Sequence, residues 1–378
     1  MARTILFVIH GVGQRAPAGS TNPASDAAKT WWKEPVDTIV SLARKHAPRA
    51  DIGLKPKDEG VQIVPLSYCD VLVDHLVGWK DAADGTKDVS AALRARYPAL
   101  GEEYLAELSD ITTDDSDFFW SKAVDVLLYR VFLDVRIRQH VRTQIVRALK
   151  EHASRGRVPA AAFVSHSLGT AVLHDTLAEL LRDPVEFGGI ANIDVLAYVS
   201  LANVSKVLTN LENPYESPVR PFGAGHTAGA RMRRFINARH ELDPIPYIGG
   251  FNPDWDPQTS NYSLVTMNRI TDPNTHSFVE YLKHPGVWAP LFEAILDKPV
   301  TPEQLEQLTE QHDKAPLPPC AAALETLRDE VESLKDAVAA LKPTTAWQSI
   351  SAFTRAARVI EEARTACVKA GANAGGGR

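Results

Sequence analysis

The chain has 378 residues, of which 44% are hydrophobic and 23% are charged, a composition typical of a globular protein with one large α/β domain or two domains. A net charge of -6 argues against a nucleic-acid partner, because nucleic-acid-binding domains normally carry a basic face. The three cysteines, Cys69, Cys320 and Cys367, are widely separated and lack metal-ligand spacing, which favours a reduced compartment over a disulfide framework and predicts no metal site.

The first apolar run, from Ile5 to Ile9, is too short for the core of a signal peptide. No run reaches the roughly 18 apolar residues that a membrane helix needs. We therefore expect a cytoplasmic protein without a transmembrane segment. Contact with a membrane surface stays open, as does export by a route that reads no N-terminal signal.

The N-terminal third alternates between strand and helix patterns. "TILFVIH" is a continuous apolar run ending at a glycine-containing turn, as expected of a strand buried on both faces. Residues 25–47 follow as an amphipathic helix, with Trp31, Trp32, Val36, Ile39, Val40 and Ala43 on one face. "GVQIVPLSYCD" predicts a second strand, and about 70–130 predicts a helical insertion or cap over the sheet.

The same alternation continues through the middle of the chain. "DVRIRQHVRTQIVRALKEHA" is an arginine-rich amphipathic helix, whose polar face we assign to solvent in preference to an anionic partner. Further strands are predicted in "VPAAAFVSHS", "IDVLAYVSLANVS" and "RRFINARH". Alternating strands and helices predict an α/β fold with a mainly parallel sheet covered on both sides.

The C-terminal part differs in character, so we divide the chain at residue 300. A Pro-rich joint is expected at 301–319, a helical extension at 320–371 and a disordered tail at 372–378. The extension carries a short heptad seam formed by Leu324, Leu327, Val331, Leu334, Val338 and Leu341. We favour packing of this seam on the protein's own body, with a homo-oligomer through the C-terminal helix as the alternative.

Ser167 is the candidate nucleophile, in "VSHSLGT" between a predicted strand and a predicted helix. Small residues two positions before and after the serine permit a sharp turn that lifts its hydroxyl above the sheet. Here those positions are Ser165 and Gly169. The alternative is a serine that caps a helix N-terminus.

Acyl transfer also needs two backbone donors for a developing oxyanion. The residue after the nucleophile, Leu168, supplies one N–H group. The loop "HGVG" after the first strand supplies the other, from Val12 or alternatively Gly13.

An acid and a base complete the set. Asp243 follows a predicted strand, and Pro244 biases it toward an extended conformation. His276 lies in "DPNTHSFVEYL", with Phe278 and Tyr281 nearby to pack its ring. Glu241 and Asp272 are alternative acids.

"VIHGVG", "VSHSLGT", "LDPIP" and "HSFVEYL" together resemble the oxyanion strand, nucleophile elbow, acid loop and histidine segment of lipase-like α/β-hydrolases. The order Ser167, Asp243, His276 is the order of that family's triad. The resemblance covers residues 1–300 in outline. The family's usual first glycine of the elbow is replaced by Ser165, and its usual first two strands are missing.

The resemblance implies a serine hydrolase that cleaves small-molecule or lipid esters through an acyl-enzyme, with no metal or cofactor. Two other readings stay open: an inactive hydrolase-fold scaffold acting through its C-terminal helices, and a thioesterase or amidase with the same triad. Apolar residues of the insertion, Phe118, Phe119, Trp120, Leu127 and Leu128, belong either to the core or to a lid over an acyl pocket.

Overall fold

The computed structural model describes the sheet, the helices packed on it and a few residues of the C-terminal extension. The described residues are 4–11, 31–57, 60–72, 74–75, 125–126, 128–153, 160–182, 193–210, 213–223, 231–248, 250–256, 260–269, 274–314, 328–329, 331–333, 336 and 365. Most of the helical insertion expected at about 70–130, most of the extension at 320–371 and the tail at 372–378 lie outside them.

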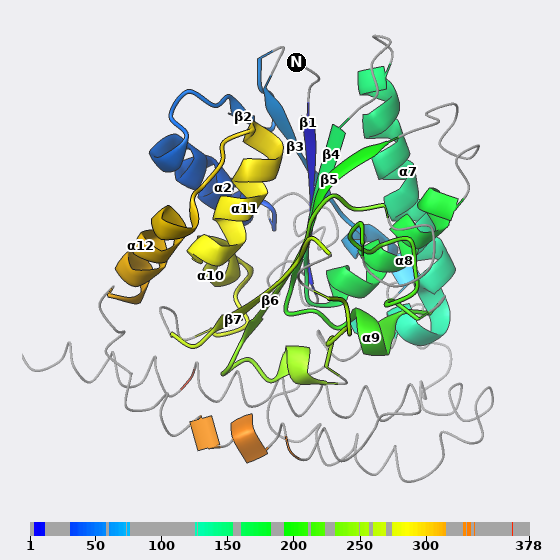
Figure 1. The fold of residues 1–378 in the computed structure, drawn as a ribbon. Helices are drawn as coiled ribbons and strands as arrows, with labels where there is room; N and C mark the ends of the chain where they lie inside the picture. The colour runs from blue at the N-terminus through cyan, green and yellow to red at the C-terminus, as the bar shows by residue number, and fades with distance from the viewer. Residues whose placement is uncertain are drawn as a thin grey trace, which may run out of the picture.

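A parallel sheet of seven strands forms the centre of the described part of the chain (Figure 1). The order across it is β2-β3-β1-β4-β5-β6-β7, and every neighbouring pair is parallel. The strands are β1 (Thr4–Ile9), β2 (Ile52–Gly53), β3 (Val61–Leu66), β4 (Ala160–His166), β5 (Asp194–Leu201), β6 (Phe235–His240) and β7 (Tyr262–Met267). The α/β fold predicted from the alternating pattern is confirmed.

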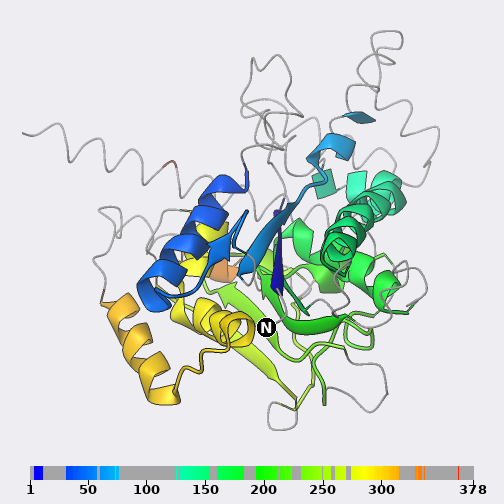
Figure 2. The ribbon, with the colours of Figure 1, turned by 90° about the horizontal axis from the view of Figure 1, so that it is seen from above.

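Helices cover both faces of the sheet, as Figure 2 shows from above. One face carries α2 (Lys33–His46), α10 (Phe278–Lys283) and α11 (Pro285–Leu296). The other carries the π-helix η2 (Leu128–Leu133), α7 (Asp134–Ala153), α8 (Leu168–Arg182) and α9 (Ser205–Leu208). Both layers are apolar where they meet the sheet.

Strand β1 shows why the sheet lies between two layers. All six of its residues are buried. Leu6 and Val8 pack into the core under α2 and α11, while Ile5, Phe7 and Ile9 pack into the core under α7 and α8. A strand buried on both faces needs a continuous apolar run, which is what the sequence has here.

The strand order reverses at β1, which positions the candidate site. After β1 the chain builds β2 and β3 on one side, and it then crosses to β4 on the other side. In open parallel sheets, ligands bind outside the carboxyl ends of the strands at such a reversal. The loops after β1 and β4, which carry Gly11 and Ser167, therefore lie where a site is expected.

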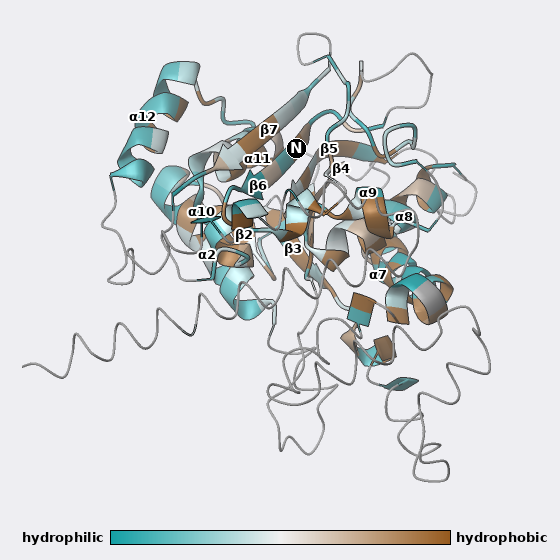
Figure 3. Ribbon diagram, turned by 90° about the horizontal axis from the view of Figure 1, so that it is seen from below, coloured by the Kyte–Doolittle hydropathy of each residue, from teal (hydrophilic) through white to brown (hydrophobic). Residues whose placement is uncertain are grey.

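Several elements differ from the sequence expectations or add to them. Helix α2 begins only at Lys33, because Trp31 and Trp32 form a turn before it. The strands β2 and β7 were not predicted. The expected joint at 301–319 contains the helix α12 (Pro302–Asp313), which begins with a capping box between Thr301 and Gln304. None of its residues is buried, and most of its ribbon has the colour of hydrophilic residues in Figure 3.

One turn of the C-terminal extension lies close to the body. Val331, a member of the predicted heptad seam, is fully buried. Burial raises the pKa of Tyr247 to about 12, and nearby carboxylates that include Glu332 act in the same direction. For these residues, packing on the protein's own body is favoured. No helix among the described residues has the length and apolarity to cross a membrane.

Candidate active site

Ser167 stands at the junction between β4 and α8 in a strained backbone conformation. Its φ angle is 53°, in the left-handed region that non-glycine residues seldom adopt. Hydrogen bonds hold the turn: the N–H of Ser167 donates to the carbonyl of Leu201 at 3.0 Å, and the N–H of Thr170 donates to the carbonyl of Ser167 at 2.8 Å. Strain of this kind persists where the surroundings enforce it and is concentrated at functional sites.

The hydroxyl of Ser167 has no structural task among the described residues. Ser167 is fully buried, and its Oγ makes no hydrogen bond. A serine that caps α8 would instead accept a bond from the N–H of Gly169 or Thr170. Since buried hydroxyls are nearly always bonded, this unpartnered oxygen argues against the capping alternative.

Close contacts explain the glycines at positions 11 and 169 of the site. A Cβ atom on Gly169 would lie 2.2 Å from the carbonyl oxygen of His10, and one on Gly11 would lie 2.6 Å from Cβ of Ser167. The loop after β1 therefore packs directly against the serine turn. Ser165, which occupies the first small position, fits because its hydroxyl donates to the carbonyl of Val199 at 3.2 Å.

We expect Gly169→Ala to disrupt this packing. The added methyl group meets a backbone carbonyl, which cannot move without shifting β1, so we expect a loss of about 3 kcal/mol or more in the free energy of unfolding. The matched control is Gly53→Ala, since a Cβ at Gly53 has nothing within 4 Å. Urea unfolding of both variants checks this, and equal stability of the two would contradict the packing argument.

Asp243 and His276 are brought together as a hydrogen-bonded pair. Nδ1 of His276 lies 2.7 Å from Oδ2 of Asp243. A carboxylate only accepts, so Nδ1 carries the proton and Nε2 is left as an acceptor. The Asp243 side chain is fully buried and that of His276 is 10% exposed. Oδ1 of Asp243 accepts the N–H of Ile245 at 3.0 Å.

The loop that carries Asp243 is braced by its neighbours. Nδ1 of His240 accepts the N–H of Leu242 at 3.0 Å, so its Nε2 carries the proton and donates to the carbonyl of Arg269 at 2.9 Å. Burial lowers the pKa of His240, which keeps the ring in this neutral form. Thr275 donates to the carbonyl of Leu242 at 2.9 Å. The acid loop and the histidine segment are thereby tied together beside the pair.

His276 lies next to the serine turn through a ring contact. Its ring centroid is 4.6 Å from that of His166, the residue before Ser167. Phe278, expected to pack on His276, stacks instead on His166 at 5.1 Å. No hydrogen bond joins Nε2 of His276 to Oγ of Ser167.

The expected oxyanion region is partly described. Leu168 is the first residue of α8, so its N–H is one of the four that have no partner within the helix. Val12 and Gly13 lie outside the described residues. The carbonyl of Gly11 is held by the hydroxyl of Tyr68 at 2.9 Å and by Nδ1 of His10.

His10 is not a candidate base. Burial lowers its pKa to about 4, so its imidazole is neutral near neutral pH. Nδ1 donates to the Gly11 carbonyl, and Nε2 lies 3.1 Å from the Cys69 sulfur. Both ring nitrogens are therefore already engaged in holding the loop.

The sequence matches no protein-family model and none of the curated proteins with which it was compared. The geometry of the residues is therefore what points to a function.

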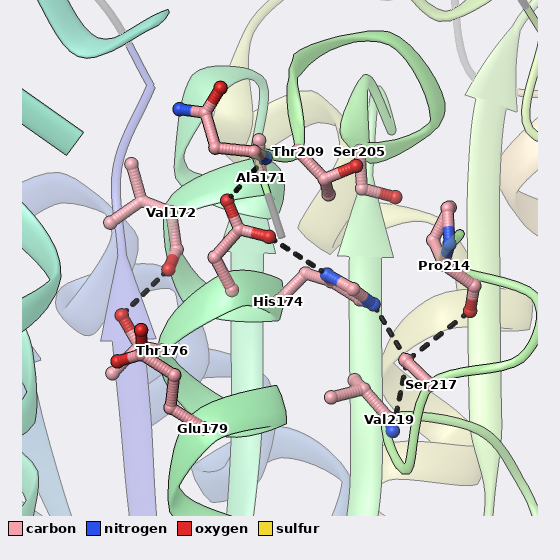
Figure 4. A network of polar contacts seen from close by, with 12 residues as sticks. Ala171, Val172, His174, Thr176, Glu179, Ser205, Thr209, Pro214, Ser217 and Val219 are labelled. Atoms are coloured by element: carbon pink, nitrogen blue, oxygen red, sulfur yellow. Dashed lines mark hydrogen bonds and ion pairs between the residues drawn. The ribbon is translucent and has the colours of Figure 1, made fainter. Parts of the chain in front are cut away.

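A second serine, histidine and aspartate meet elsewhere in the fold, as Figure 4 shows around His174. Nε2 of His174 lies 2.7 Å from Oγ of Ser217, and its Nδ1 lies 3.4 Å from Oδ1 of Asp175. Asp175 also accepts from the hydroxyl of Tyr129 at 2.7 Å and from the N–H of Asn210 at 2.9 Å. This group is buried and fully bonded, so it braces α8 against its neighbours.

The hydroxyls of Ser217 and Ser167 differ in their hydrogen bonding. Oγ of Ser217 donates to the carbonyl of Pro214 at 3.3 Å and accepts the N–H of Val219 at 3.2 Å. Ser217 is therefore engaged structurally, whereas Oγ of Ser167 is not. Of these two serines, Ser167 alone combines a strained turn with a hydroxyl that has no partner among the described residues.

The structure describes some of the other residues predicted for the site, and the rest lie outside the described residues. Asp243, and not the alternative Glu241, is the carboxylate bonded to His276. Asp272 and the proposed lid residues Phe118, Phe119, Trp120 and Leu127 lie outside the described residues, whereas Leu128 is buried in the core. Within the described part of the chain, no three His, Cys, Asp or Glu side chains gather to hold a metal ion.

Three contacts were not foreseen from the sequence: the stacking of His166 on Phe278, the hydroxyl of Tyr68 on the Gly11 carbonyl, and the hydroxyl of Tyr281 on Asp243. The sequence signal for Tyr281 is its place five residues after His276, from which we expected only that it packs against the histidine ring.

Proposed function

We propose that the protein is a serine hydrolase that cleaves carboxylic esters through an acyl-enzyme intermediate. The observation that carries this proposal is the strained Ser167, whose buried hydroxyl has no partner among the described residues, beside a histidine already bonded to a buried aspartate. Nucleophile, base and orienting acid are the groups that acyl transfer by serine requires.

Each residue has one role in the proposed reaction. Nε2 of His276 takes the proton of Ser167 as Oγ attacks the ester carbonyl, and it then returns this proton to the departing alkoxide. Asp243 holds Nδ1 of His276 and stabilises the charged ring. Water, activated by the same histidine, then releases the acid and restores Ser167.

Backbone N–H groups stabilise the oxyanion in this proposal. Leu168 supplies one from the start of α8, where the helix dipole also favours negative charge. Val12 supplies the other. The Gly11 carbonyl belongs to the same peptide unit as the Val12 N–H, and Tyr68 and His10 hold that carbonyl. Removing one such donor typically costs about 100-fold or more in turnover.

The burial of Ser167 places a condition on substrate access. Because Ser167 is fully buried, an ester reaches it only after some of the surrounding chain moves. Comparison of short- and long-chain p-nitrophenyl esters shows whether the opened site accepts a small-molecule or a lipid-like acyl group. Parallel assays with a thioester and an anilide separate ester cleavage from the two related acyl chemistries.

A fluorophosphonate probe tests the proposal against the scaffold alternative. We expect the native protein to be labelled on Ser167, because the probe reacts only with a serine activated by its surroundings. Heat-denatured protein and Ser167→Ala should remain unlabelled. A native protein that takes up no label would instead support a scaffold that keeps the fold without the reaction.

A further inference from the structure

The carboxylate of Asp243 has a second side-chain donor. Oη of Tyr281 lies 2.7 Å from Oδ2 of Asp243, the same oxygen that accepts Nδ1–H of His276 at 2.7 Å. We propose that Tyr281 is a positioning residue that fixes the Asp243 carboxylate and limits how strongly it binds the imidazole of His276. The proposal rests on the function proposed above, to which it adds a fourth side chain.

Tyr281 is itself held in place. It is fully buried in α10, five residues after His276, and its Oη accepts the N–H of His240 at 3.0 Å. With that bond accepted, the single phenolic proton is left for Asp243. One short segment thus supplies both the base and the group that restrains the acid.

The protonation state of Tyr281 suits this role. Burial raises the pKa of Tyr281 well above its usual value, and the neighbouring Asp243 carboxylate acts in the same direction. The phenol therefore remains a donor throughout the pH range in which a histidine works as a base.

A shared acceptor oxygen has a defined consequence for the pair. A hydrogen bond to a carboxylate stabilises its charge, which weakens the pull of that charge on a second donor. Removal of the Tyr281 hydroxyl should strengthen the hold of Asp243 on a protonated His276. It should also let the carboxylate turn, since the Ile245 N–H is then the bond that fixes its other side among the described residues.

Other ionisable groups also surround the pair, and a conservative variant leaves them in place. They are His166 at the end of β4, His240 and Glu241 after β6, Tyr247 in the 3-10 helix η3 (Ile245–Tyr247), and Glu280 in α10. A change on removing the Tyr281 hydroxyl therefore reports on that hydroxyl.

The test compares Tyr281→Phe with Tyr129→Phe in the full chain. Both variants lose a buried phenol that donates to a buried aspartate at 2.7 Å, but Asp175, the partner of Tyr129, lies in the network that braces α8. For Tyr281→Phe we expect kcat/KM near neutral pH to fall about tenfold, with the acid limb of the pH–rate profile moved to higher pH. Tyr129→Phe should keep the wild-type profile.

Proton NMR of the His276 Nδ1–H resonance gives a readout that does not depend on activity. We expect this resonance to move downfield in Tyr281→Phe, as the bond to Asp243 strengthens, and to stay in place in Tyr129→Phe. If Tyr281→Phe does not fold, replacement of Tyr281 by 3-fluorotyrosine, a stronger donor, should move the acid limb to lower pH and the resonance upfield.

The outcomes separate the two proposals. An unmoved resonance and an unchanged pH profile in the Tyr281 variants would overturn the role of Tyr281 and leave the hydrolase intact. A wild-type protein without Ser167-dependent hydrolysis would remove the proposed function, and the resonance alone would then decide whether Tyr281 controls the Asp243–His276 bond.

Discussion

Ser167→Ala is expected to lower kcat for a p-nitrophenyl ester by about 1,000-fold or more, because members of a catalytic triad act as a unit. This loss of kcat should come without a loss of stability, since Oγ of Ser167 makes no hydrogen bond to any of the residues that the structure describes. Steady-state hydrolysis by the purified variant, with thermal unfolding measured beside it, checks both statements.

Ser165→Ala is the matched control for this loss. Ser165 is also a fully buried serine, two residues earlier on β4, but its hydroxyl donates to the carbonyl of Val199. We expect this variant to lose about 1 kcal/mol of stability and to keep its activity. Equal hydrolysis by Ser167→Ala and wild type would remove Ser167 from the reaction.

Asp243→Asn should have the next largest effect, a fall in kcat of about 10,000-fold. The change keeps the shape of the side chain but replaces an acceptor by an amide that can donate. His276 then no longer needs to carry its proton on Nδ1, and the charged ring of the proposed reaction would lose its counter-charge. Measurement of kcat at saturating ester checks this expectation.

Glu241→Gln is the control for Asp243→Asn. Glu241 lies two residues earlier in the same loop, where its N–H donates to the carbonyl of Met267 at 2.7 Å, and the carboxylate bonded to His276 is that of Asp243. We expect less than a threefold change in kcat. A large loss in Glu241→Gln together with an active Asp243→Asn would exchange the roles of the two carboxylates.

The interior of the sheet was predictable because its sequence signals are strong. Strands such as β1 and β4 are buried on both faces, and this burial requires the continuous apolar runs that the sequence shows. The edge strand β7 carries no such run, since most of its residues are exposed or half-buried. Few of its positions require an apolar residue, so its sequence showed no distinctive hydrophobic pattern. Helix α12 was missed for the same reason, as it buries no residue.

The candidate site was predictable to the extent that it is encoded locally. The turn at Ser167 needs small neighbouring residues in the sequence. The reason is that Gly169 lies so close to the carbonyl of His10 that a side chain would not fit there. The pairing of Asp243 with His276 was expected because Asp243 follows a predicted strand and the order Ser167, Asp243, His276 resembles that of the α/β-hydrolase triad. The hydroxyl of Tyr281 reaches Asp243 only because α10 docks against the end of β6. Such docking has no signature in a short stretch of sequence.

The central claim is that Ser167, His276 and Asp243 form one reacting unit at the carboxyl ends of the strands. A crystal structure of the protein after reaction with a fluorophosphonate tests it most directly. We predict a phosphorus bonded to Oγ of Ser167, a phosphonyl oxygen at the N–H of Leu168, and Nε2 of His276 within about 3 Å of the adduct. A label on another residue, or an imidazole of His276 turned away from the adduct, would contradict this claim.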